Sequence, residues 1–192
     1  MAAITLPFTT IEGQVEIDDP GPVAEATLSV CNLGGPPDND GTILRNFPGD
    51  DYPGYEVFAG RVGLPTARTL QAAPAGLEDS SAAFFSKAGL NVKPDRPFTL
   101  VVPRNWRERL SIAWGGARRT LRLRVDLECG DAPDDTWVGY PGGYWIDEPA
   151  CAPLIVKTEG SARRVRLGIG APCDFLPSTG EPDGERQAAT LP

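Results

Sequence analysis

The sequence predicts an all-β protein, and two observations lead to this fold class. Apolar and polar side chains alternate with a period of two in several short segments, which is typical of strands with one buried face. The 22 glycines and 20 prolines are spread along the 192 residues, so these segments are separated by turns. Short alternating segments between turns favour an antiparallel β-sandwich, immunoglobulin-like or jelly-roll-like, with long loops and at most one short helix.

The clearest strand is predicted at 121–128. Leu121, Leu123 and Val125 would face the core, while the arginines and acids between them would face solvent. Similar alternation occurs at 25–31, 97–102 and 109–114. Weaker strands are predicted at 14–17, 42–47, 55–60, 136–140 and 143–147.

One segment fits either a helix or a strand. Residues 77–89 could form two or three helical turns capped by Ser80 and ended by Gly89, or an irregular strand containing Phe84 and Phe85. The acidic segment 36–53 is predicted to be a long loop interrupted by a short strand. A single sandwich domain is expected over 1–175, followed by a flexible tail over 176–192.

Residues 150–173 predict a β-hairpin. A two-residue turn at Gly160 and Ser161 would place Val156 opposite Val165 and Leu154 opposite Leu167, with all four apolar side chains on one face. Cys151 would then lie opposite Gly170. A bend at Pro172 would bring Cys173 within reach of Cys151.

The four cysteines allow three disulfide pairings. Cys151–Cys173 is favoured, which leaves Cys31–Cys129 as the second pair, and four buried free thiols are the alternative. Zinc is disfavoured because the chain has no CxxC pair and no histidine. Disulfides would indicate an oxidising location, at the cell surface or outside the cell.

The charge and hydropathy exclude several classes of partner. A formal net charge of −8 argues against a nucleic-acid partner, and no apolar run is long enough for an integral membrane segment. Residues 1–10 do not read as a signal peptide, so either the protein is not exported or the sequence starts after the export segment. No cofactor and no metal are predicted; the acidic run at 38–41 lacks the spacing of a calcium loop.

Three segments resemble a known group of domains: VVPRNWRERLSIAWG (101–115), YPGGYWIDEPACAPLIV (140–156) and RRVRLGIGAPC (163–173). Together they are similar to uncharacterised secreted or membrane-tethered β-rich domains of high-GC Gram-positive bacteria. The resemblance covers the second half of the chain. It implies an extracytoplasmic location and carries no activity. LPSTG at 176–180 matches a sortase signal, and a chance match is the preferred interpretation.

The segment 131–149 holds the candidate site residues. Trp137, Tyr140, Tyr144 and Trp145 could present aromatic rings to a sugar, or could instead fill the core. Asp147 and Glu148 could serve as a glycosidase pair. The absence of histidine excludes the usual serine or cysteine triad.

The expected function is therefore non-enzymatic. The chain would bind or scaffold at the cell surface or envelope, with a protein or a cell-envelope glycan as partner. Its binding surface would be the aromatic segment or the arginine-bearing strand face. A virion structural protein, such as a capsid decoration or tail component, is the first alternative. A glycan-active enzyme is the second.

Overall fold

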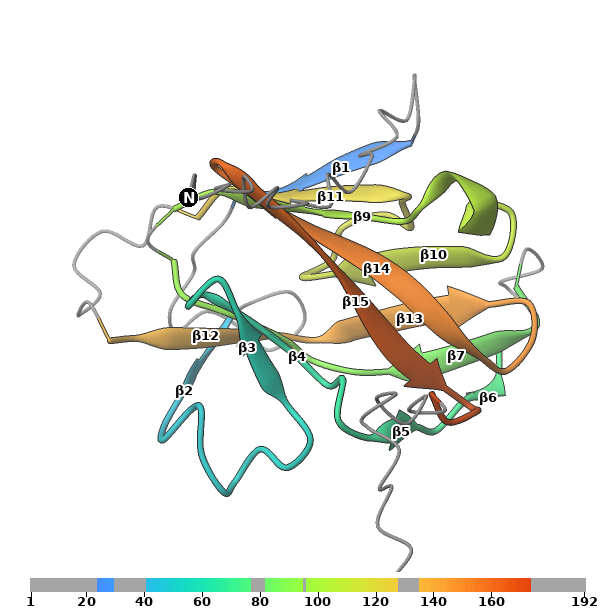
Figure 1. The fold of residues 1–192 in the computed structure, drawn as a ribbon, viewed down its shortest axis with the longest axis horizontal. Coiled ribbons are helices and arrows are strands. Elements are labelled where there is room, and N and C mark those ends of the chain that lie inside the picture. The colour runs from blue at the N-terminus through green and yellow to red at the C-terminus, as the bar shows by residue number, and fades with distance from the viewer. Residues whose placement is uncertain (1–23, 30–40, 77–81, 95, 128–134, 174–192) are drawn as a thin grey trace, which may run out of the picture.

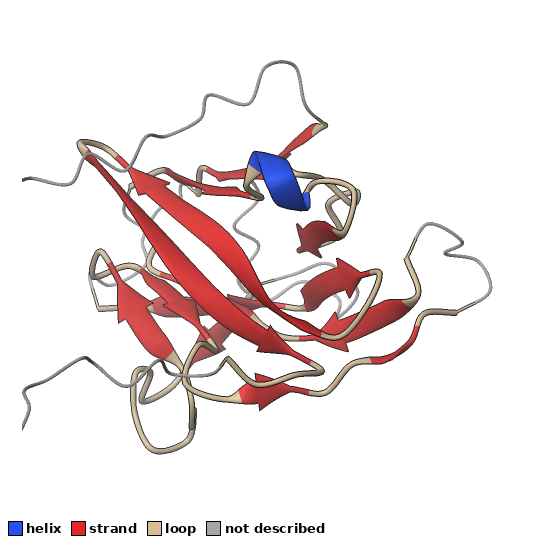
Figure 2. Cartoon of the chain, turned by 45° about the vertical axis from the view of Figure 1, so that its right-hand side comes forward, coloured by secondary structure: helices blue, strands red, loops and turns tan. Residues whose placement is uncertain are grey.

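The computed structural model describes residues 24–29, 41–76, 82–94, 96–127 and 135–173. Nearly all regular structure in these residues is β (Figure 1). The one helix among them is the single 3-10 turn η1 (Arg104–Trp106), which is blue in Figure 2. The all-β class and the single short helix are as the sequence predicts. No helix in this part of the chain has the length and apolar character needed to cross a membrane.

The first layer is a six-stranded sheet in the order β1-β11-β9-β14-β15-β5. Its strands are β1 (Glu25–Leu28), β5 (Thr69–Leu70), β9 (Phe98–Val101), β11 (Arg122–Val125), β14 (Ala150–Thr158) and β15 (Ser161–Ile169). Its pairings are antiparallel except at the two ends, where β1 pairs parallel with β11 and β5 pairs parallel with β15. The sheet is therefore mixed rather than purely antiparallel.

The other strands form two smaller sheets. One has the order β10-β13-β7-β6, with β6 (Ala73–Pro74), β7 (Phe84–Lys87), β10 (Leu110–Trp114) and β13 (Gly142–Ile146). The other has the order β2-β12-β8-β4-β3, with β2 (Thr42–Leu44), β3 (Glu56–Phe58), β4 (Val62–Leu64), β8 (Leu90–Val92) and β12 (Trp137–Tyr140).

These two sheets are halves of one layer. Tyr140 pairs with Leu90 in one sheet and Gly143 pairs with Lys87 in the other, so the same register runs through the junction. The Ala88 N–H also donates to the Gly142 carbonyl at 3.0 Å, which continues the pairing between the halves. In Figure 1 the long β14–β15 hairpin runs diagonally across this second layer.

The core lies between the two layers. Leu100, Leu123 and Leu154 contribute from the six-stranded sheet, and Ile112 and Tyr144 contribute from the second layer; all five are fully buried. Burial of this apolar surface is the main force that holds the layers together. The predicted inward faces of 97–102 and 109–114 are thereby confirmed, and so is that of 121–127 for Leu123 and Val125, whereas Leu121 is only partly buried.

The β14–β15 hairpin forms, but its register differs from the prediction by two residues. Thr158 pairs with Ser161, so the turn residues are Glu159 and Gly160 rather than Gly160 and Ser161. Gly160 has φ +75° at the second turn position, a backbone conformation that glycine adopts readily. Leu154 consequently faces Val165 instead of Leu167.

The shift preserves the faces of the hairpin because side chains alternate with a period of two. Leu154, Val156, Val165 and Leu167 are all buried, as expected, and Arg164 and Arg166 are exposed. The predicted register was therefore wrong, but the prediction of which hairpin side chains face the core and which face solvent was correct.

The Cys151–Cys173 disulfide is present, with 4.8 Å between its α-carbons. Cys151 lies opposite Gly168, not Gly170, and the chain reverses at Gly170, where φ is +67°. A Cβ at Gly168 would lie 2.9 Å from the Ala171 carbonyl oxygen, so the returning segment crosses directly over this glycine. The reversal is at Gly170 and not at Pro172. The proposed partners Cys31 and Cys129 lie outside the described residues.

Residues 84–87 form β7, so the strand interpretation of this segment is correct and the helix is wrong for its described part. Pairing of β7 with both β13 and β6 satisfies backbone groups that a helix would have paired locally. The predicted strand at 14–17, the acidic run at 38–40 and the LPSTG segment lie outside the described residues.

Candidate functional site

The four predicted aromatic site residues lie on two opposite faces of the second layer. Tyr140 and Tyr144 point into the core, where they are 1% and 0% exposed. Trp137 and Trp145 occupy odd positions on the same strand path and therefore point to the outer face. The core interpretation of this segment thus holds for the two tyrosines.

Trp137 faces outward but is covered by the segment between β2 and β3. The Phe47 ring packs against the Trp137 ring with 4.6 Å between centroids, and the Lys93 ammonium lies 5.9 Å from the indole centroid. Tyr52 and Tyr55 pack in turn on Phe47. Only 4% of Trp137 is exposed, so it offers no surface to a ligand.

Tyr144 packs edge-on against Trp114, with 5.2 Å between ring centroids. Burial raises the pKa of the Tyr144 hydroxyl far above its ordinary value. That hydroxyl has no hydrogen-bond partner among the described residues. Tyr144 is therefore a neutral core residue.

Trp145 is the remaining member of the four, and it is partly exposed. Phe85 on β7 pairs directly with it, and the two rings lie 4.6 Å apart at 40°. The Arg119 guanidinium lies 5.2 Å from the indole centroid and donates to the Ser111 hydroxyl at 2.8 Å and 3.1 Å. Ser111 is the β10 residue directly opposite Trp145. We call Phe85, Trp145, Arg119 and Ser111 the Trp145 platform.

A groove of about 410 Å³ opens beside the platform. Residues from four parts of the chain line it: Ala82, Arg107, Glu108, Arg109, Leu110, Ser111, Arg119, Leu121 and Trp145. The groove thus combines an aromatic ring with guanidinium and hydroxyl groups that can donate hydrogen bonds. This combination can bind a ligand that has both an apolar face and oxygen acceptors.

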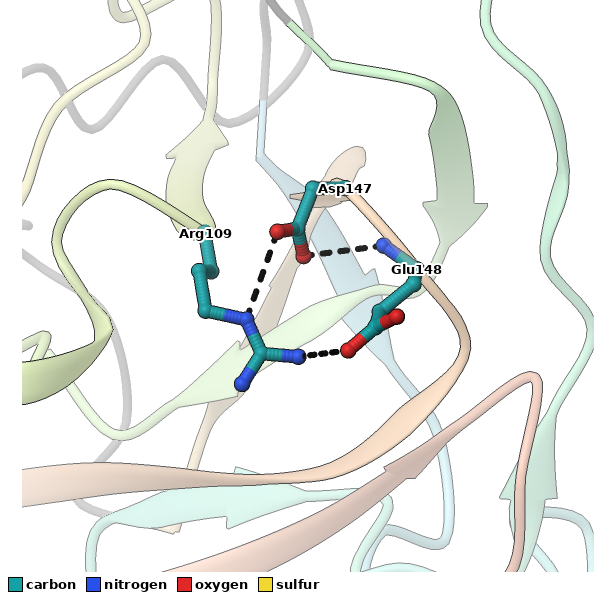
Figure 3. Close-up of polar contacts among 3 residues, drawn as sticks. All are labelled: Arg109, Asp147 and Glu148. Carbon is teal, nitrogen blue, oxygen red and sulfur yellow. Dashed lines mark hydrogen bonds and ion pairs between the residues drawn. The ribbon is translucent and has the colours of Figure 1, made fainter.

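The predicted carboxylates Asp147 and Glu148 both contact Arg109, which lines this groove (Figure 3). Arg109 Nε lies 3.3 Å from Asp147 Oδ2, and the same guanidinium donates to Glu148 Oε1. Asp147 Oδ1 accepts the Glu148 backbone N–H at 2.9 Å. The Arg109 guanidinium also lies 4.6 Å from the Trp106 ring centroid.

This geometry does not fit a glycosidase pair. Such a pair flanks the bond to be cleaved, with the two carboxyl groups on opposite sides of it. Asp147 and Glu148 are consecutive residues held by one guanidinium, and neither lines the groove. Their role in the structure is to fix Arg109.

The structure brings together groups that the sequence did not connect. Strand pairing places Ser111 and Phe85 on either side of Trp145, although both are far from it in the sequence. Arg119 reaches the indole from outside the strands. The alternation of side chains along a strand by itself predicts that Trp145 and Tyr144 point to opposite faces of the sheet. No local signal indicates that Phe47 covers Trp137 while Trp145 stays open.

No group of three or more potential metal ligands occurs among the described residues. Comparisons of the chain with protein-family models, with curated proteins and with solved structures found no match. The function of the protein therefore has to be inferred from the site itself.

Proposed function

We propose that this protein is a non-enzymatic, extracytoplasmic binding domain that holds a cell-envelope glycan on the Trp145 platform. The single observation that carries this proposal is the position of Trp145. Of the four aromatic residues in the segment it is the one that is left partly exposed, and it lines a groove rich in hydrogen-bond donors.

The chemistry suits a saccharide. One face of a sugar ring is made of C–H groups that pack on an aromatic ring, and its hydroxyl oxygens accept hydrogen bonds from guanidinium groups. Ser111 holds Arg119 in place beside the indole, so the donor is positioned before a ligand arrives. Arg109 is held in the same way by Asp147 and Glu148.

The Cys151–Cys173 disulfide supports the extracytoplasmic part of the proposal. Structural disulfides form and persist in oxidising compartments and are rare in a reducing cytoplasm. The resemblance of residues 101–115, 140–156 and 163–173 to secreted domains points to the same location.

The experiment is co-sedimentation of the purified protein with isolated bacterial cell-wall glycan. Trp145→Ala removes the ring and is expected to weaken binding about tenfold, and Trp145→Phe is expected to restore part of it. Tyr52→Ala is the matched control, because Tyr52 is also a partly exposed aromatic residue and does not line the groove. Thermal unfolding of each variant reports whether the fold is intact.

Unchanged binding by a folded Trp145→Ala variant would overturn the proposed site. Release of soluble fragments from the glycan by the wild-type protein, lost in Asp147→Asn, would overturn the non-enzymatic assignment.

A further inference from the structure

The net charge of the chain hides a large difference between its parts. The described residues hold 17 of the 18 lysines and arginines but only 10 of the 26 acidic residues, which amounts to a net charge of +7. The other residues therefore carry −15. A net charge summed over the whole chain does not give the local charge beside a particular strand, so it does not exclude a polyanionic partner at a basic site.

Three of these arginines lie on β15. Arg163, Arg164 and Arg166 are all exposed and lie within four consecutive residues. The ion pairs formed among the described residues involve Arg109, Arg122 and Arg124, and none of them involves these three. Their positive charges are therefore not neutralised by a carboxylate within that part of the chain.

A second groove, of about 230 Å³, lies beside these arginines. We call it the β15 groove; its lining residues are Glu56, Phe58, Thr66, Arg163, Arg164, Val165, Arg166 and Cys173. The Thr66 hydroxyl donates to the carboxylate of Glu56, the acidic residue of the lining. The lining of the β15 groove therefore includes three arginines and one carboxylate, and that carboxylate already accepts a hydrogen bond.

Neighbouring contacts position two of the guanidinium groups. The Arg163 guanidinium lies 5.0 Å from the Phe58 ring centroid, and Arg166 Nε lies 3.2 Å from the Sγ atom of Cys151 in the disulfide. Arg164 and Arg166 follow each other on the same face of β15, roughly 7 Å apart along the strand. Guanidinium groups bind carboxylate and phosphate oxygens through two parallel hydrogen bonds.

We propose that the β15 groove binds an anionic glycan polymer, one in which phosphate or carboxylate groups recur along the chain. Recurring anions match Arg164 and Arg166, which follow each other on one face of β15. Single-stranded nucleic acid fits less well, because bases bind by stacking on exposed rings. The one ring of the groove, Phe58, is 4% exposed and lies beneath Arg163. This site is separate from the Trp145 platform and does not depend on it.

The experiment measures binding of the full chain to two probes, poly(glycerol phosphate) and polygalacturonate, by calorimetry at low and high salt. The variant Arg164→Gln/Arg166→Gln is expected to bind roughly tenfold more weakly, and wild-type affinity is expected to fall as salt rises. The control Arg45→Gln/Arg96→Gln removes the same charge from exposed positions outside the β15 groove.

A preference for one probe identifies phosphate or carboxylate as the recognised group. Equal loss of affinity in both double variants would overturn the site, because it would show that only total charge matters. Tighter binding of a single-stranded oligonucleotide than of either glycan probe would overturn the ligand class. Trp145→Ala is expected to leave this binding unchanged, which separates the test from that of the proposed function.

Discussion

At the scale of single residues, Tyr144 shows that burial and polarity conflict in this core. Its ring fills space against Trp114, whereas its hydroxyl lacks a partner among the described residues. An unpaired buried hydroxyl has lost its hydrogen bonds to water without replacement, which costs about 1–3 kcal/mol. Tyr55 is the contrasting case, since its hydroxyl donates to the Gly89 carbonyl at 3.1 Å.

Tyr144→Phe is therefore expected to raise the free energy of unfolding, by up to about 1–3 kcal/mol, because it removes only the unpaired hydroxyl. Tyr55→Phe is expected to lower it by about 1 kcal/mol, because it removes a satisfied hydrogen bond. Urea unfolding at neutral pH measures both. A destabilised Tyr144→Phe variant would show that the hydroxyl has a partner.

The same hydroxyl predicts an alkaline loss of stability. Burial raises the pKa of Tyr144 above its ordinary value, so the unfolded chain releases this proton at a lower pH than the folded chain does. Above pH of about 10 the unfolded state binds fewer protons, and stability falls as pH rises. In Tyr144→Phe this decline should be shallower than in wild type when unfolding is followed from neutral to alkaline pH; identical slopes would contradict the assignment.

At the scale of elements, the β14–β15 hairpin shows what turn chemistry decides. The alternating pattern is compatible with any register that differs by two residues, because such shifts return every side chain to the same face. The choice among them depends on the position of Gly160 in the turn and on the reversal at Gly170. Gly168 then provides the space in which residues 171–173 cross to reach Cys151.

Gly168→Val is expected to prevent this crossing, because its side chain would collide with the Ala171 carbonyl. The free energy of unfolding should fall by nearly as much as in Cys151→Ala/Cys173→Ala. That double variant is expected to lose about 3 kcal/mol, because the disulfide closes a loop with a sequence separation of 22 residues. Thermal unfolding measures the loss of stability, and labelling of free thiols shows whether the Cys151–Cys173 disulfide has failed to form. Full stability with no labelled thiol would show that the segment closes by another path.

At the scale of the whole molecule, the two proposed binding sites depend on the two-layered fold and on an uneven distribution of charge along the chain. The second layer continues from β12 into β13 and from β8 into β7, so a single surface carries both the covered Trp137 and the open Trp145. The opposite sheet carries the β15 arginines. The two proposed binding sites share no lining residue, although the β15 groove also includes Glu56 and Phe58 of the second layer.

The location of the protein is also a property of the whole chain. If the protein works in an oxidising compartment, Cys31 and Cys129 should be bonded as well as Cys151 and Cys173. Each disulfide is a two-electron oxidation, so reduction should then raise the intact mass by about four hydrogen masses. Mass spectrometry of protein purified from its native source measures this. No mass change on reduction would favour assembly in a reducing cytoplasm, as for a virion protein.

The sequence by itself determined the all-β class, the inward faces of its main strands and the Cys151–Cys173 pair. These three features depend on residues that are close in the sequence. Alternation within one strand shows its buried face, and a short turn brings the two strands of a hairpin together. The register of that hairpin was wrong by two residues, because alternation does not distinguish such shifts. Only the tertiary structure decided which aromatic side chain stays open and which arginines share a groove. Burial and proximity between distant segments depend on how strands pair across the sheet, which no local pattern specifies.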